Sequence, residues 1–139
     1  MNERLDYQLS HGLARLGIGV NIALHGLTRI PKLAAFTASL HEEFGKTVLP
    51  PALIQAAAYG IVASETTLGI LLLLGLWQRA VFTGGALLMC VLTFGTCLIQ
   101  NWPVAGGQLV YLAFFAVLLA TRRFDRFSID GWLRNTAVT

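Results

Sequence analysis

Four long apolar stretches, each close to the length of a membrane-spanning helix, occupy most of this 139-residue chain. About 20 consecutive apolar residues cross the hydrocarbon core of a bilayer as an α-helix. Only 12% of the residues are charged and 55% are hydrophobic, whereas soluble domains carry about 25% charged residues. We therefore expect an integral membrane protein built as a single transmembrane domain over residues 1–139, with no separate soluble module.

The pattern predicts an all-α fold, a transmembrane four-helix bundle. Pro31 should end the first helix, and Pro50 and Pro51 should open the second, because proline fits only the first turn of a helix. The segment 31–50 places apolar residues at helical spacing, which predicts a short amphipathic helix at the membrane interface between helices one and two. The four spans are expected at residues 9–30, 51–76, 80–100 and 104–121.

Lysine and arginine near the helix ends predict the orientation, because cytoplasmic loops carry the excess of these residues. With both termini inside, seven cations lie on the inner side: Arg4, Arg15, Arg79, Arg122, Arg123, Arg126 and Arg134. Three lie outside: Arg29, Lys32 and Lys46. We therefore expect a multi-pass protein of the bacterial plasma membrane, N-in and C-in, with a basic cytoplasmic tail over 122–139 resting against anionic headgroups. The cations do not cluster into a surface for nucleic acid, so we expect none to bind.

The start of the chain has no secretory-signal pattern, so the first apolar stretch is expected to remain as a helix. That helix carries a polar stripe. At 100° per residue its members fall within about 120° of arc: His11, Arg15, Asn21, His25 and Arg29. Exposure of such groups to lipid is costly, so the stripe should face the bundle interior. Two interpretations stay open: hydrogen bonds that hold the helices together, or a ligand or proton site.

Glu65 is the sharpest single residue, since it lies near the middle of the second predicted span. The rise per residue brings it level with Asn21 in an antiparallel neighbour. A pair with Arg15 would keep the carboxylate ionised, and a pair with His25 would exchange protons near neutral pH. An ion pair that only fixes helix register is the structural alternative.

The last span contributes Gln108 and Tyr111 on one side. Tyrosine, glutamine and histidine in an apolar cavity would suit a quinone headgroup, whose carbonyls need donors within apolar walls. Cys90 and Cys97 lie about 10.5 Å apart along one helix, too far for a disulfide. We expect them to act as small apolar residues. The sequence carries no haem, flavin, metal or iron–sulfur signature.

The chain resembles the DoxX family of small four-helix bacterial membrane proteins. The matching pieces are RLG at 15–17, HG at 25–26, Glu65 with Gly69, LLLLGLWQR at 71–79 and FSID at 127–130. Arg29 stands where lysine is common, and RRFDR replaces the usual glycine-rich approach to the terminal signature. The resemblance implies a plasma-membrane helical bundle, and some members resemble the small subunit of thiosulfate:quinone oxidoreductases.

Together these observations predict the membrane subunit of a quinone-linked oxidoreductase system. Glu65 and His25 are the candidate catalytic residues, and no metal site is expected. The candidate quinone- or substrate-binding residues are Arg15, Asn21, Arg29, Gln108 and Tyr111. Expected partners are the lipid bilayer and either another subunit, which would supply electrons, or a second copy of the chain. Two alternatives stay open: a non-enzymatic membrane anchor or assembly factor, and transport of a small solute or proton.

Overall fold

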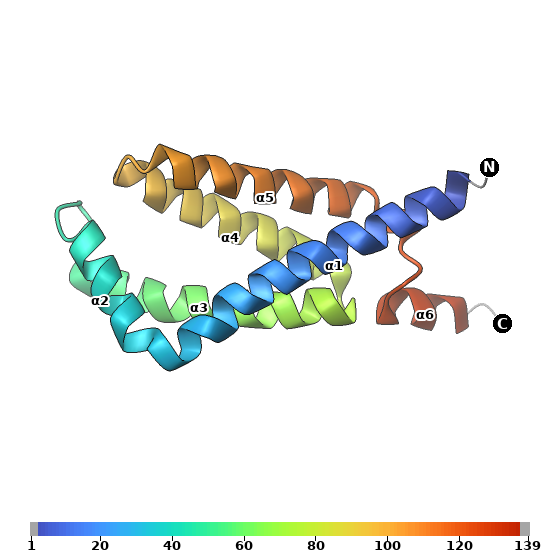
Figure 1. The fold of residues 1–139 in the computed structure, drawn as a ribbon, viewed down its shortest axis with the longest axis horizontal. Helices are drawn as coiled ribbons and strands as arrows, with labels where there is room; N and C mark the ends of the chain where they lie inside the picture. The colour runs from blue at the N-terminus through green and yellow to red at the C-terminus, as the bar shows by residue number, and fades with distance from the viewer. Residues whose placement is uncertain (1–2, 137–139) are drawn as a thin grey trace.

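A computed structural model describes residues 3–136, and all regular secondary structure within them is helical. The elements are α1 (Glu3–Arg29), the 3-10 turn η1 (Ile30–Lys32), α2 (Leu33–Phe44), α3 (Pro51–Leu74), α4 (Gln78–Leu98), α5 (Trp102–Ala120), the 3-10 turn η2 (Arg122–Phe124) and α6 (Ile129–Thr136). The predicted all-α class is confirmed. Helices α1, α3, α4 and α5 run along the molecule, with α2 at one end and both termini at the other (Figure 1). We call these the α2 end and the terminal end.

Three helices of the described part are long and apolar enough to cross a membrane: α3, α4 and α5. Their most apolar windows have mean hydropathies of 1.7, 1.9 and 1.9. The sequence predicts a fourth span over α1. This helix has 27 residues, which is long enough to cross a membrane. Its polar stripe lowers its mean hydropathy, so its composition alone does not identify it as a span. The chain is therefore a multi-pass helical membrane protein with three spans evident from composition.

The bundle consists of two closely packed pairs, α1 with α3 and α4 with α5. Glycines permit the close approach. A Cβ atom added at Gly69 would lie 2.3 Å from the backbone nitrogen of Ala23, and one at Gly26 would lie 2.4 Å from that of Thr66. A Cβ at Gly85 would meet the ring of Phe115 at 2.3 Å. Such approach is what membrane helices use in place of a hydrophobic drive.

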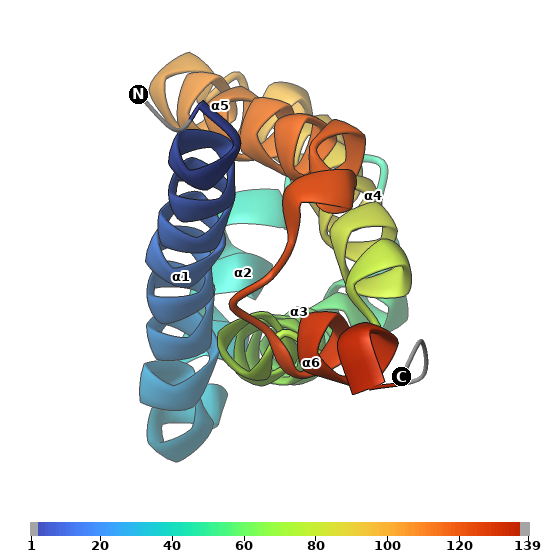
Figure 2. The ribbon, with the colours of Figure 1, turned by 90° about the vertical axis from the view of Figure 1, so that its right-hand side faces the viewer.

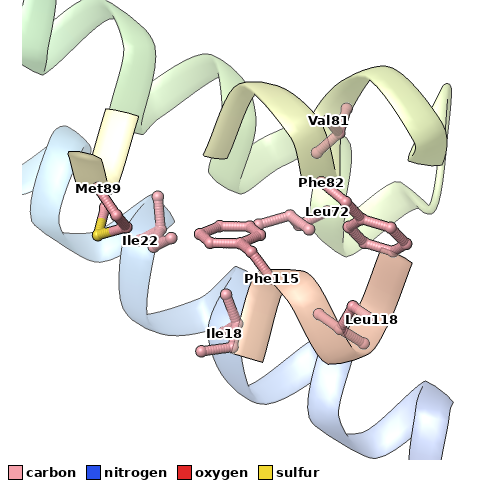
Figure 3. Close-up of a cluster of buried hydrophobic side chains, with 8 residues drawn as sticks. All are labelled: Ile18, Ile22, Leu72, Val81, Phe82, Met89, Phe115 and Leu118. Atoms are coloured by element: carbon pink, nitrogen blue, oxygen red, sulfur yellow. The ribbon is translucent and has the colours of Figure 1, made fainter. Parts of the chain in front are cut away.

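An apolar core joins the two pairs and extends from the terminal end of the bundle to its middle (Figure 3). Phe82 of α4 and Phe115 of α5 are completely buried, and Leu72 of α3 packs against the same cluster. Ile22 and Met89 belong to this core and also line the space beyond it toward the α2 end. The bundle is therefore filled by side chains from its terminal end to its middle and hollow at the α2 end.

At the terminal end the chain after α5 folds back over the α3–α4 turn. Gly75 ends α3 with φ +67°, and its carbonyl accepts the backbone N–H of Asp130 at 3.1 Å. The Asp130 carboxylate accepts the backbone N–H groups of Trp77 and Gln78 at 3.1 and 2.9 Å, which caps the start of α4. This segment, which we call the C-terminal clasp, is defined by residues 125–131.

The sequence predicts a basic tail over 122–139 that rests against anionic headgroups. The structure docks residues 125–131 of this tail onto the bundle and begins α6 at Ile129. Local hydrogen bonds shape this segment: the Ser128 hydroxyl donates to Asp125 and accepts the backbone N–H of Gly131 at 2.9 Å. Residues 137–139 and the side chain of Arg134 lie outside the described part of the chain.

Candidate functional site

A cavity of about 690 Å³ occupies the α2 end, between the two helix pairs. Figure 2 looks along the bundle from the terminal end: α1, α5, α4 and α3 surround the axis, and α2 crosses behind them. The walls are mostly apolar, with contributions from Ile22, Leu53, Ile54, Met89 and Leu92. Six of the seven predicted site residues line it: Asn21, His25, Arg29, Glu65, Gln108 and Tyr111. We call this space the α2-end cavity.

Arg29 and Glu65 form an ion pair on the cavity wall, through one guanidinium nitrogen of Arg29 and Oε2 of Glu65. The Glu65 side chain is 7% exposed and that of Arg29 is 31% exposed, so the carboxylate is the more deeply placed member. The guanidinium carbon also lies 4.7 Å from the centre of the Phe36 ring on α2, a cation–π distance. The pair therefore links three helices, α1, α3 and α2, at the mouth of the cavity.

His25 lies one turn before Arg29 on α1 and presents one free ring nitrogen. Its Nδ1 is 2.9 Å from the Asn21 carbonyl oxygen. A carbonyl can only accept, so Nδ1 carries the hydrogen, and in the neutral imidazole Nε2 is then an acceptor. His25 therefore keeps Nε2 as a hydrogen-bond acceptor while Nδ1 bonds to the helix.

The opposite wall carries Gln108 and Tyr111 on α5, both half-buried. The Thr96 hydroxyl of α4 donates to Oε1 of Gln108 at 2.8 Å. This bond fixes the amide so that its nitrogen remains to donate toward a ligand. The cavity thus has a charged wall on α1 and α3 and a neutral hydrogen-bonding wall on α5.

Arg15 is the predicted site residue that the structure places elsewhere. Its guanidinium donates to the carbonyls of Leu72 and Leu73 at the end of α3 and to that of Phe127 in the C-terminal clasp, the last at 2.7 Å. Neither Arg15 nor His25 pairs with Glu65. Gly26 packs against Thr66, which brings Glu65 level with the end of α1, where Arg29 pairs with it. His11, also in the polar stripe, bonds through Nδ1 with the Thr121 hydroxyl at 2.9 Å. The stripe therefore divides, with His11 and Arg15 serving the terminal end and the remaining three facing the cavity.

Helix α2 supplies cavity residues that sequence reasoning missed. Phe36, Leu40 and Phe44 line the cavity, together with Ser39 and Glu43. The apolar spacing in this segment predicts a face for the membrane interface. The same spacing fits a helix that covers an apolar cavity, and a one-sided hydrophobic pattern does not distinguish the two.

The two cysteines are free thiols, Cys90 exposed on α4 and Cys97 half-buried. Within the described residues, no group of three or more histidine, cysteine, aspartate or glutamate side chains is arranged to hold a metal ion. The ionisable groups that face the cavity are thus Arg29, Glu65, His25, Glu43 and Tyr111.

The fold and the cavity define a class: a multi-pass helical membrane protein with a polar-walled pocket inside its bundle. A family model described as methylamine utilisation protein MauE matches residues 8–108, more than half of the chain, and the chain belongs to this family. No significant match was found among characterised proteins or among solved structures.

The resemblance to DoxX proteins is wrong, since the matching family is MauE. The pieces that carried it have general roles in packing and capping. Gly26 and Gly69 allow α1 and α3 to touch, and Asp130 of FSID caps α4. Short motifs of this kind recur wherever membrane helices pack closely, so they identify a helical bundle better than they identify a family.

Proposed function

We propose that this chain is an integral membrane component of methylamine utilisation that binds a lipid-soluble quinone in the α2-end cavity. The family supplies the process, as its description names methylamine utilisation. The cavity supports the ligand: about 690 Å³ with apolar walls and a few polar groups is the usual make-up of a small-molecule site.

The observation that carries the proposal is the gathering of six polar side chains from α1, α3 and α5 around one apolar space. Arg29, Gln108 and Tyr111 would donate hydrogen bonds to the carbonyl oxygens of the headgroup. Glu65 and the free Nε2 of His25 would give or take protons. A quinone accepts two electrons and two protons, and a partner subunit would deliver the electrons.

We further propose that α1 is a fourth span. Twenty-seven residues of helix reach about 40 Å, enough to cross the bilayer. Its polar groups would be tolerated because they bond with α3, α4 and the C-terminal clasp in place of lipid. Four spans account for both termini lying at one end (Figure 1). In a bacterial plasma membrane, the positive-inside count favours that end in the cytoplasm, and the cavity would then lie toward the outer leaflet.

A pair of neighbouring glycines on α5 offers a test of the cavity. Gly107 lines it and Gly106 does not, and a Cβ added at either meets nothing within 4 Å. Gly107→Phe should fill the cavity and lower quinone affinity at least ten-fold, whereas Gly106→Phe should stay within two-fold of the unmodified protein. Quinone titration of the purified protein in detergent, followed by tryptophan fluorescence, measures both. Equal affinities for the two variants would remove the α2-end cavity as the site.

A further inference from the structure

A second hollow lies at the terminal end, on the outer side of α4. It has a volume of about 700 Å³ and is lined by the α3–α4 turn, the first three turns of α4, Arg122 of η2 and Asp130 of the C-terminal clasp. It shares no residue with the α2-end cavity. We call it the α4 groove.

Chemical character changes along the α4 groove. Its terminal end carries Arg79 and Arg122 beside the exposed indole of Trp77. Beyond them lie Ala80, Thr83, Gly84 and Leu87. The Thr83 hydroxyl donates to the carbonyl of Arg79 at 2.8 Å, so Thr83 contributes its methyl group to the groove. One end of the groove is cationic and the rest is apolar.

Within the described residues, Arg79 and Arg122 form no ion pair with an acidic side chain; the ion pair found there is Arg29–Glu65. Asp130, the acidic residue in the groove, already accepts two backbone N–H groups at the start of α4. Arg79 is the second residue of α4, and a cation in the first turn opposes the helix dipole. An anion bound here would pair with the two arginines and would also interact favourably with the dipole at the start of α4.

We propose that the α4 groove binds an anionic phospholipid, with the phosphate between Arg79 and Arg122 and one acyl chain against Thr83, Gly84 and Leu87. The eight residue-to-residue steps from Arg79 to Leu87 rise about 12 Å. That is most of one leaflet of hydrocarbon, about 15 Å. Trp77, 70% exposed, stands at the headgroup level where tryptophan is enriched. Helix α4 is one of the three apolar spans, and its groove residues Ala80, Thr83 and Leu87 are exposed, so this face would meet lipid.

The test uses native mass spectrometry of the full chain in detergent, with phosphatidylglycerol and phosphatidylcholine of the same acyl chains. Each arginine near a membrane surface contributes roughly a five-fold gain for anionic lipid. Arg79→Gln with Arg122→Gln should therefore lower phosphatidylglycerol retention about 25-fold. Arg4→Gln with Arg126→Gln removes the same charge from exposed positions at the same end and should change retention less than two-fold.

Gly84→Leu tests the acyl chain separately. A Cβ at Gly84 lies 3.6 Å from Leu68, so the backbone accepts a side chain that then fills the groove. Retention of phosphatidylglycerol should fall at least five-fold with every charge intact, and glycerol phosphate, which has no chains, should not compete. Equal losses for the two arginine pairs, or full competition by glycerol phosphate, would overturn the proposal.

Discussion

Replacing Arg15 with methionine is expected to lower the free energy of unfolding by about 3 kcal/mol or more, the largest effect of any single change in this chain. Its guanidinium satisfies carbonyls of Leu72 and Leu73 at the end of α3, where a cation also matches the helix dipole. The same group holds the Phe127 carbonyl. Each hydrogen bond to a charged group is worth about 1.5–3 kcal/mol. Unfolding of the purified protein by a denaturing detergent measures the loss.

The matched control is Arg4→Met, an exposed arginine on the same helix, which should cost less than about 0.5 kcal/mol. Release of the C-terminal clasp should accompany the loss at Arg15. Trypsin should then cut after Arg126 faster than in the unmodified protein. If Arg15→Met unfolds at the same denaturant concentration as Arg4→Met, the hydrogen bonds to α3 and the clasp contribute nothing to stability.

Breaking the Arg29–Glu65 pair is expected to give the second largest effect. A fully buried pair costs about 3–5 kcal/mol when one partner is removed. Because the Arg29 side chain is 31% exposed, we expect about 2 kcal/mol for Arg29→Gln and for Glu65→Gln. The double variant should lose less than the sum of the two, with a coupling of about 1 kcal/mol or more. The same unfolding assay provides the full double-mutant cycle.

Quinone affinity in these variants separates stability from binding. Arg29→Gln removes a charged donor and should weaken binding about ten-fold even at temperatures where the variant is folded, as helical circular dichroism can verify. Lys32→Gln, an exposed cation of η1 outside the cavity lining, provides the matched control. Additive stability losses would contradict the ion pair, and unchanged quinone affinity in Arg29→Gln would contradict its role in the site.

Much of the fold was predictable because hydrophobic length and proline position act locally. The structure ends α1 at Arg29, just before Pro31, and begins α3 at Pro51. The C-terminal clasp was not predictable in this way. It depends on contacts between residues far apart in the chain, such as Asp130 with the backbone of Gln78. The charge composition predicts only a basic tail. A carboxylate that caps a helix far away in the sequence leaves no local sequence pattern.

The candidate site was predictable in its residue types and less so in its pairings. Helical periodicity placed Asn21, His25 and Arg29 on one face, and they line one cavity. Rise per residue put Glu65 level with Asn21, yet it pairs with Arg29, two turns further along α1. The two helices pack in a different register from the predicted one, because Gly26 lies against Thr66 and Gly69 against Ala23. Glu65 is therefore level with the end of α1 that carries Arg29. The polar stripe places Arg15 in the same predicted site, but Arg15 lies outside the cavity. A stripe on one helix does not show how far along that helix a cavity extends.

The central claim is that the α2-end cavity holds a quinone. Photolabelling with an azidoquinone, followed by mass spectrometry of the peptides, tests it most directly. We predict label on the α3 segment Leu53–Glu65 and on α5 between Gly107 and Tyr111, removed by excess unlabelled quinone. Label confined to exposed positions outside the cavity lining, such as Val117 and Leu119, or label that excess quinone does not reduce, would contradict the claim.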